Sequence, residues 1–350
     1  MAARPTRVLV VDDSALFRTL VSETLATDPE LEVVASVPDP LAAWAAIKAY
    51  QPDVLTLDIE MPRMDGLTFL DLLMTNHPLP VVLVSSLTGR GDDVALRALQ
   101  LGAVEVVQKP TTDLAQSYTA LAYELIAKVK TAAIAHPRRG ATPLAPNPVT
   151  ASRSAPSFRS TQLVIAVGAS TGGTEALATL IAGLPADAPG LVIVQHILAR
   201  FTAPFARRLD GLGQVRVREA RDGDRVLLGH ALLATGGRHV RLQRDGAQYL
   251  VRLDDGAPVS GHRPSVDVLF RSCAVAAGRN AVGVILTGMG ADGADGMKAM
   301  RDAGARTLAQ DERTCVVFGM PKEAIARGGV EQVLAIENLA AATLAAAQRS

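Results

Sequence analysis

The chain has 350 residues, enough for two domains of roughly 150 residues each, and its 49% hydrophobic and 20% charged residues exclude a disordered protein. No apolar run approaches the roughly 18 residues of a membrane span, and the basic N-terminus lacks a signal-peptide core, so we expect a cytoplasmic protein without membrane insertion. The net charge is zero, but the charges are unevenly distributed: residues 1–130 hold 10 Lys/Arg and 17 Asp/Glu, whereas residues 161–350 hold 21 Lys/Arg and 18 Asp/Glu. An acidic domain followed by a mildly basic one argues against a nucleic acid partner.

The first 130 residues alternate between strand and helix patterns. Short apolar runs predict strands, and apolar residues at helical spacing, such as Leu16, Leu20 and Val21, predict the helices between them. The expected strands are 7–11, 31–37, 54–57, 81–85 and 104–107, and the expected helices are 14–26, 41–50, 67–75, 92–101 and 112–130. This alternation indicates a parallel sheet covered by helices on both faces, a (βα)5 domain over residues 5–130.

A Pro-rich segment, residues 131–160, interrupts this alternation and is expected to be a flexible linker. A second domain follows over residues 161–348. Its expected strands are 162–167, 191–195, 281–286 and 305–309, and its expected helices are 174–182, 204–209, 265–277, 294–303, 321–327 and 336–348. Between them, short β-like pieces at 225–228, 231–234 and 249–253 stand among Gly and Asp-Gly turns and predict hairpins. The fold class is α/β throughout, with a doubly wound, mostly parallel second domain that carries a β-hairpin insertion.

Polar side chains follow four of the strands in the first domain. Asp12 and Asp13 end the first strand, and Asp58 ends the third. Sites form at the carboxyl ends of parallel strands, so these carboxylates should converge, and close carboxylates repel unless a cation such as Mg²⁺ neutralises them. Ser85 and Lys109 end two further strands. The Ser85 hydroxyl and the Lys109 ammonium could then bind a phosphoryl group on Asp58. The alternative is that these residues only cap helices.

This domain resembles the receiver domain of bacterial response regulators over residues 5–130. The matching residues are Val11-Asp12-Asp13-Ser14, Asp58 through Gly66, Ser85 and Lys109-Pro110. The resemblance implies that a partner histidine kinase supplies a phosphoryl group to Asp58 and that Ser85 and Lys109 sense it. It also implies a cis Lys109–Pro110 bond and a Mg²⁺ ion held by Asp12, Asp13, Asp58 and the backbone carbonyl of Glu60. The sequence departs from the usual pattern at Val106, where receivers carry an aromatic switch residue.

A Gly-x-Ser-x-Gly motif, residues 168–172, follows a predicted strand and opens a predicted helix in the second domain. Such a turn exposes its serine, here Ser170, as in a nucleophile elbow. The segment lacks the glycine register and the lysine that phosphate-binding loops require. The alternative is a Gly/Ser/Thr turn that only caps the helix.

A serine nucleophile needs a base and a carboxylate that orients the base. Of the six histidines, only His196 directly follows a predicted strand, which places it at the same sheet edge as Ser170. Asp292 follows another strand in a Gly-rich loop, where a helix N-cap is the alternative. The chain order Ser, His, Asp differs from that of α/β-hydrolases, in which the acid precedes the histidine.

The second domain resembles the catalytic domain of the chemotaxis protein-glutamate methylesterase (CheB) family. The matching segments are 168–173, Gln195-His196, 263–270, 287–293 and 310–321. The resemblance implies hydrolysis of glutamate γ-methyl esters on chemoreceptor helices, with release of methanol, and deamidation of receptor glutamines, with no cofactor for the esterase. It assigns Ser170, His196 and Asp292 to a catalytic triad. It further assigns Thr171 and the Met289 backbone amide to oxyanion stabilisation. Ile197-Leu198 departs from the Met-Pro pair that usually follows the histidine.

Together the resemblances imply a hydrolase for chemosensory adaptation whose receiver inhibits the esterase until Asp58 is phosphorylated. The opposite charges of the two domains would favour their attraction. Two alternatives stay open: another hydrolase or amidase under receiver control, for example a peptidase, and a receiver-controlled transcription factor, which needs a helix-turn-helix and a basic face. The two cysteines, Cys273 and Cys315, exclude a disulfide framework and are expected to be buried thiols.

Overall fold

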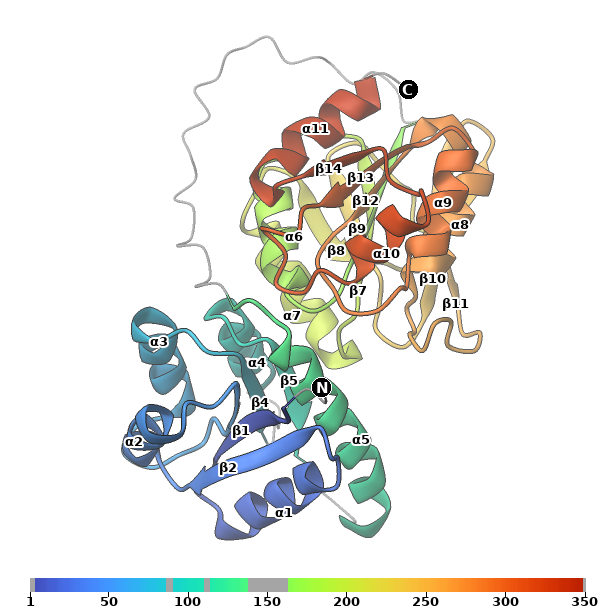
Figure 1. The fold of residues 1–350 in the computed structure, drawn as a ribbon. Coiled ribbons are helices and arrows are strands. Elements are labelled where there is room, and N and C mark those ends of the chain that lie inside the picture. The colour runs from blue at the N-terminus through green and yellow to red at the C-terminus, as the bar shows by residue number, and fades with distance from the viewer. Residues whose placement is uncertain (1–3, 86–90, 110–113, 138–162, 349–350) are drawn as a thin grey trace. The chain divides into compact units, whose positions relative to one another are not determined.

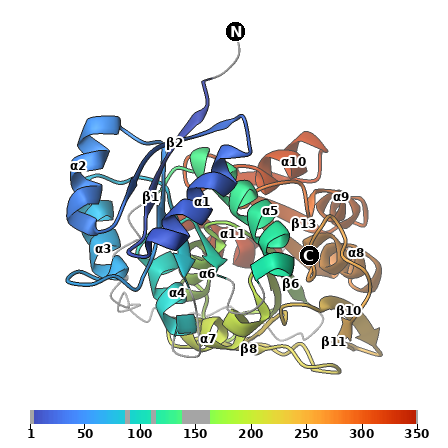
Figure 2. The same ribbon diagram turned by 90° about the horizontal axis from the view of Figure 1, so that it is seen from below.

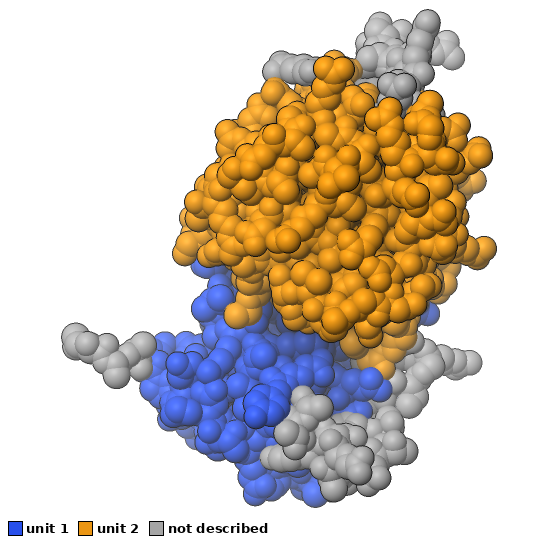
Figure 3. All heavy atoms as spheres, turned by 90° about the vertical axis from the view of Figure 1, so that its right-hand side faces the viewer, with its two compact units in different colours: residues 1–142 blue, residues 143–350 orange. Residues whose placement is uncertain are grey.

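The computed structural model describes residues 4–85, 91–109, 114–137 and 163–348. The chain divides into two compact units, Met1–Thr142 and Pro143–Ser350 (Figure 3). Most of the predicted linker lies outside the described residues, but the helix before it continues to Ala133, past the expected end at Lys130. In the described part of the chain, no helix is long and apolar enough to cross a bilayer.

The first unit is a (βα)5 domain, as predicted. Its elements are β1 (Thr6–Val11), α1 (Ala15–Ala26), β2 (Leu31–Val37), α2 (Pro40–Tyr50), β3 (Val54–Leu57), α3 (Gly66–Asn76), β4 (Val81–Ser85), α4 (Gly91–Gln100), β5 (Glu105–Gln108) and α5 (Leu114–Ala133). The strands pair in parallel in the order β2-β1-β3-β4-β5. Helices α1 and α5 cover one face of the sheet, and α2 and α3 cover the other (Figures 1 and 2).

The second unit is built on a seven-stranded parallel sheet in the order β14-β13-β12-β6-β7-β9-β8. Its strands are β6 (Val164–Ala169), β7 (Gly190–Gln195), β8 (Arg216–Glu219), β9 (His230–Leu233), β12 (Ala281–Ile285), β13 (Arg306–Gln310) and β14 (Gln332–Leu334), and β10 (His239–Asp245) and β11 (Gln248–Asp254) form a separate antiparallel hairpin. The helices are α6 (Gly173–Ala182), α7 (Ala199–Asp210), α8 (Val266–Ala276), α9 (Ala294–Asp302), α10 (Met320–Ala326) and α11 (Ile336–Gln348), with a 3-10 turn at Gly278–Asn280. Helices α6 and α11 lie on one side of the sheet and α8 and α9 on the other (Figure 1).

The chain order of the strands locates the sites in both sheets. In the second unit β6 is central, the chain moves from it to β7 on one side, and it returns later to β12 on the other. In the first unit β1 stands in the same way between β2 and β3. Ligands bind at such switch points, outside the carboxyl ends of the strands. These are the ends at which Asp12, Ser170 and Asp292 follow their strands.

Two details of the second unit differ from the sequence prediction. Among the described strands, β10 and β11 form the hairpin, whereas β8 and β9 extend the parallel sheet beyond β7, and Arg225 makes a single bridge to Leu250 rather than starting a strand. Helix α7 begins at Ala199, before the expected start at Pro204, so the proline lies inside the helix. Burial of Phe201 and Phe205 on one helical face offsets the backbone hydrogen bond that proline removes.

Candidate active site

The acidic side chains of the first unit come together as predicted. Strands β1 and β3 pair with Val11 opposite Leu57, so Asp12 and Asp58, which directly follow, lie at adjacent strand ends. One oxygen from each of Asp12, Asp13 and Asp58 lies within 4.8 Å of the others. Asp12 and Asp58 are each only 3% exposed. Three carboxylates in this arrangement fit a Mg²⁺ ion, which prefers oxygen ligands and leaves positions open for water and phosphate.

Lys109 joins this pocket from the end of β5. Its Nζ lies 2.6 Å from Asp12 Oδ2 and 2.7 Å from Asp58 Oδ2, and it also stands over the ring of Phe17 at 4.7 Å. Burial raises the pKa of the Asp58 carboxyl, although the Lys109 ammonium acts in the opposite direction. Ser85, also buried, accepts a hydrogen bond from the Lys109 amide at its carbonyl oxygen, at 2.8 Å. The two phosphoryl-sensing candidates therefore stand at adjacent strand ends.

Helix capping does not account for this cluster. Ser14 caps α1 and Asp65 caps α3, whereas Asp58 makes its side-chain contacts to Lys109 and to the Ile59 amide. Val106 is buried in β5, where an aromatic switch residue would stand. The expected cis bond before Pro110 lies outside the described residues.

Ser170 and His196 lie side by side in the second unit. Strands β6 and β7 pair with Ala169 opposite Gln195, and Ser170 and His196 are the next residues of each strand. The His196 amide donates a hydrogen bond to the Ala169 carbonyl at 3.1 Å, and Gln195 Nε2 donates one to the Ser170 carbonyl at 2.9 Å. The backbone that carries the serine is thus fixed from the neighbouring strand.

The turn after Ser170 requires its glycines. Gly172 has φ +76°, and a Cβ on it would lie 2.5 Å from Val316 Cβ. A Cβ on Gly173 would lie 2.1 Å from Gln195 Oε1. A left-handed conformation and these two close approaches leave no room for a side chain. The motif is therefore a tight strand–turn–helix connection that leaves Ser170 partly exposed.

Asp292 reaches the same site from the loop after β12. Its Oδ2 accepts hydrogen bonds from His196 Nε2 at 2.8 Å and from the Val266 amide at 2.7 Å. Its Oδ1 accepts hydrogen bonds from Ser265 Oγ at 2.7 Å and from the Asp267 amide at 3.1 Å. The two amides belong to the N-terminus of α8, whose dipole favours an anion there. Asp292 thus binds the N-terminus of α8, and the N-cap of the helix that follows it, α9, is Gly293 instead.

These contacts determine the charge of the carboxylate and which imidazole nitrogen donates to it. Burial alone would raise the pKa of Asp292, but the hydrogen bonds from His196, Ser265 and the Val266 amide outweigh it and hold that pKa below its ordinary value. The carboxylate is therefore ionised, and His196 Nε2 carries a proton and donates it. The other ring nitrogen, Nδ1, is buried and has no hydrogen-bond partner among the described residues. A neutral imidazole so held has its free lone pair on Nδ1.

The two oxyanion candidates lie in segments that adjoin Ser170. Thr287 Oγ1 donates to the Thr171 carbonyl at 2.9 Å, which ties the loop after β12 to the serine turn. A Cβ on Gly288 would lie 2.7 Å from Ser170 Cβ, so the backbone just before Met289 packs against the serine. Gln310 Oε1 in turn accepts from the Thr287 amide at 2.9 Å.

Three residues that the sequence analysis gave no role also contact the site. Gln195 fixes the serine backbone, Ser265 binds Asp292, and the His262 ring stacks on the His196 ring. The N-cap position of Ser265 could have been predicted from the sequence, since a serine directly before a helical pattern is a common N-cap. No sequence pattern points to the contact of His262, because His196 is far away from it in sequence. Cys273 and Cys315 are buried free thiols, as expected, and burial raises the pKa of Cys273 to about 12.

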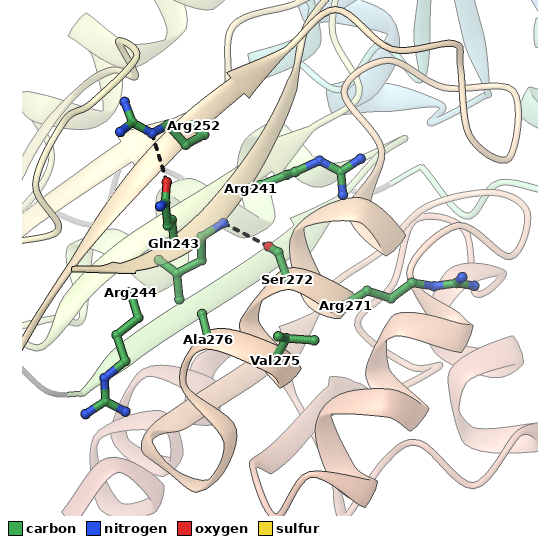
Figure 4. Close-up of a pocket in the computed structure, with 9 residues that line it drawn as sticks. Arg241, Gln243, Arg244, Arg252, Arg271, Ser272, Val275 and Ala276 are labelled. Atoms are coloured by element: carbon green, nitrogen blue, oxygen red, sulfur yellow. Dashed lines mark hydrogen bonds between the residues drawn. The ribbon is translucent and has the colours of Figure 1, made fainter. Parts of the chain in front are cut away.

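A hollow of about 670 Å³ between the β10–β11 hairpin and the C-terminal half of α8 includes none of the predicted site residues. Four arginines line it: Arg241, Arg244, Arg252 and Arg271. Figure 4 shows these side chains pointing in different directions rather than toward a common point. Three of them are paired with the carboxylates of Asp254, Asp222 and Asp295. The hollow therefore has little uncompensated charge with which to hold an anion.

The fold and the acidic pocket place the protein in the class of two-domain response regulators, with a receiver domain followed by an α/β domain. Residues 8–119 match the response regulator receiver domain, and residues 165–343 match the CheB methylesterase family. The chain belongs to the CheB methylesterase family and is a hydrolase. The match over the second unit is thus to a methylesterase and not to a DNA-binding domain.

Individual relatives cover nearly the whole chain. It is 55% identical over 345 residues to "Protein-glutamate methylesterase/protein-glutamine glutaminase 2" of Pseudomonas aeruginosa, which covers 99% of this chain and 98% of the relative. It is 54% identical over 340 residues to the Pectobacterium atrosepticum protein-glutamate methylesterase/protein-glutamine glutaminase, with 97% and 96% coverage. The crystal structure of the Thermotoga maritima CheB methylesterase catalytic domain superposes with a TM-score of 0.51 and 34% identity, covering 52% of this chain and 97% of that one.

Proposed function

We propose that the second unit hydrolyses glutamate γ-methyl esters on the cytoplasmic helices of chemoreceptors and deamidates glutamines at equivalent positions. The observation that carries this proposal is that His196 and Ser170 follow paired residues of β7 and β6, with His196 Nε2 bound to the Asp292 carboxylate and its buried Nδ1 without a hydrogen-bond partner among the described residues. This is the arrangement that an acyl-transfer enzyme with a serine nucleophile needs. The names of the full-length relatives supply the substrate class.

In the proposed reaction, Ser170 Oγ attacks the ester carbonyl while its proton passes to His196 Nδ1. Asp292 stabilises the imidazolium that forms and keeps Nε2 protonated. The tetrahedral oxyanion lies near Thr171 and the Met289 amide, where hydrogen-bond donors would stabilise it. The imidazolium returns its proton to the departing methoxy group, so methanol leaves and an acyl-serine remains. Water then attacks the acyl-serine with His196 as base, and the free glutamate and Ser170 are restored.

The same steps on a glutamine side chain release ammonia instead of methanol and also yield glutamate. None of them needs a cofactor. A peptidase would use the same three side chains on a main-chain amide, so the leaving group distinguishes the two activities. The experiment is to incubate the protein with radiomethylated receptor cytoplasmic fragments and with an unmethylated peptide library. We expect volatile labelled methanol and intact peptides. Peptide cleavage without methanol release would refute the esterase assignment.

We propose that the first unit accepts a phosphoryl group on Asp58 from a chemosensory histidine kinase and that this relieves inhibition of the esterase. A Mg²⁺ ion held by Asp12, Asp13, Asp58 and the Glu60 carbonyl would neutralise charge on the phosphoryl oxygens. The Lys109 ammonium, now shared by Asp12 and Asp58, would pair with the phosphoryl group. The Ser85 hydroxyl would turn toward the same oxygens. Both residues end strands, so their movement toward the phosphoryl group would reshape the surface of the receiver domain.

Replacing Asp58 with asparagine should abolish phosphoryl acceptance and leave only basal esterase activity. With labelled acetyl phosphate and Mg²⁺, the wild type should take up label and hydrolyse ester faster, whereas D58N should do neither. Asp71→Asn is the matched control, since Asp71 is an exposed carboxylate on α3 of the same domain and should leave both responses unchanged. A D58N protein that still takes up label at the normal rate would show that another residue is the acceptor.

A further inference from the structure

The ring of His262 lies flat on the ring of His196. Their centroids are 3.7 Å apart and the planes meet at 10°. His196 is the base of the proposed triad, so this contact involves the group that must receive the serine proton. His262 makes no hydrogen bond to Asp292, whose four bonds come from other residues. Its contact with the site is therefore through the face of its ring.

The backbone of His262 is held rigidly. Val259 and His262 exchange two main-chain hydrogen bonds, at 3.1 and 3.0 Å, across a two-residue turn. Ser260 and Gly261 in that turn have φ +53° and +79°, the left-handed pair of a type I′ turn. The chain then runs directly to Ser265 and Val266, which bind Asp292. One short segment therefore places the ring on the base and the donors on the acid.

The His196 imidazole needs a second contact to fix the plane of its ring. The hydrogen bond from Nε2 to Asp292 fixes one atom of the imidazole but leaves the ring able to turn about that bond. Nδ1 has no hydrogen-bond partner among the described residues, so no second bond sets the plane. A flat ring packed against one face does set it, and the direction of Nδ1 follows from the plane.

We propose that His262 is a positioning residue that fixes the plane of the His196 imidazole and thereby keeps Nδ1 directed at Ser170. This inference rests on the proposed function, because it concerns the base of that reaction. The stacked face of the His262 ring, and not its ring nitrogens, positions the His196 imidazole.

The charge state of His262 is compatible with this role. Burial lowers its pKa to about 4; His196 adds to this effect, and Asp292 opposes it. At neutral pH the His262 ring is uncharged, so it does not repel the positive charge that His196 acquires during the reaction. An aromatic face also attracts a cation that stacks on it.

The test compares three substitutions in the full chain with a small methyl ester as substrate. His262→Ala and His262→Gln remove the aromatic face, and each should lower kcat by about 10²-fold with little change in KM, the loss that a base misplaced by about 1 Å causes. His262→Phe keeps a flat ring without nitrogens and should restore most of kcat. His77→Ala, an exposed histidine of the first unit, is the matched control and should have no effect.

A second readout does not depend on activity. In protein labelled with ¹³C- and ¹⁵N-histidine, the His196 ring should be fixed in the wild type and in H262F and give narrow Cδ2–H and Cε1–H resonances. In H262A and H262Q these resonances should broaden as the ring turns, while the proton on Nε2 stays bonded to Asp292. Full activity and narrow ring resonances in H262A would overturn the proposal, and so would an H262F protein as slow as H262A. If the wild type hydrolyses no ester but the ring resonances behave as expected, the proposed function fails and the positioning role stands.

Discussion

Substitution of Ser170 by alanine should lower methyl-ester hydrolysis by about 10⁴-fold or more and leave the fold intact. Loss of the nucleophile removes the covalent route, and the activity that remains comes from binding and oxyanion stabilisation alone. The structure gives a reason to expect no unfolding. Ser170 is held through its backbone, by its amide to the Thr287 carbonyl at 3.0 Å and by its carbonyl to Gln195, and these bonds do not use Oγ.

The measurement is methanol release by S170A against the wild type, with thermal unfolding monitored in parallel. Ser36→Ala is the matched control, because Ser36 is an exposed serine in β2 of the other unit. An S170A protein with near-normal turnover would show that Ser170 is not the nucleophile. A large fall in the unfolding temperature would instead make the activity loss uninformative about chemistry, and Ser170→Cys would then separate the two effects.

The sequence predicted the receiver pocket because its signals are local. Each of Asp12, Asp58 and Lys109 directly follows a strand, and the carboxyl ends of parallel strands meet at one sheet edge. The same reasoning placed Ser170 beside His196. In this α/β fold, the residues that directly follow the strands were therefore the ones from which the candidate sites could be predicted.

What the sequence could not predict depends on contacts between distant segments. The sequence of β9 resembles a hairpin strand, but β9 lies in parallel between β8 and β7, and β7 is far away in sequence. Neither the Ser265–Asp292 bond nor the His196–His262 stack can be found from periodicity, because both join different loops in space. Such contacts become visible only when the topology is known.

The departure at Ile197-Leu198 also becomes clearer in the structure. Leu198 has φ −61°, the value that a proline would impose at this position. The backbone beside His196 thus adopts the conformation that the usual Met-Pro pair favours. Leu198 is 41% exposed, so an apolar side chain stands two residues after His196, where the family carries proline.

Replacement of Asp292 with asparagine should lower kcat by about 10³- to 10⁴-fold, the scale seen when the acid of a serine triad is made an amide. The Asp292 carboxylate faces four donors, from Ser265, Val266, Asp267 and His196. An asparagine offers one oxygen and one NH₂ group. If the NH₂ group faces His196, the imidazole must present Nε2 as an acceptor and carry its proton on Nδ1. Nδ1, the nitrogen that receives the Ser170 proton in the proposed reaction, is then unable to accept it. If the oxygen faces His196, the tautomer survives, but the imidazolium loses its ionised partner.

Both orientations leave at least one backbone amide of α8 facing a donor, and a buried unsatisfied donor costs about 1–3 kcal/mol. D292N should therefore unfold at lower temperature than the wild type at neutral pH. Asp302→Asn is the matched control, because Asp302 is exposed at the end of α9 and its carboxylate pairs with Lys298 on the surface. It should change neither kcat nor the unfolding temperature.

The stability difference between D292N and the wild type should also depend on pH. The hydrogen bonds to Asp292 hold its pKa in the folded protein below the ordinary value, so the stabilisation is fully present above the unfolded pKa of about 3.9. It is lost as the pH falls through the lower folded pKa, and asparagine cannot titrate. Chemical unfolding at pH 7 and at a series of pH values below 4 should therefore show the two proteins converging as the pH falls. Equal stabilities at pH 7, or a difference that stays constant into acid, would contradict an ionised Asp292 bound by α8.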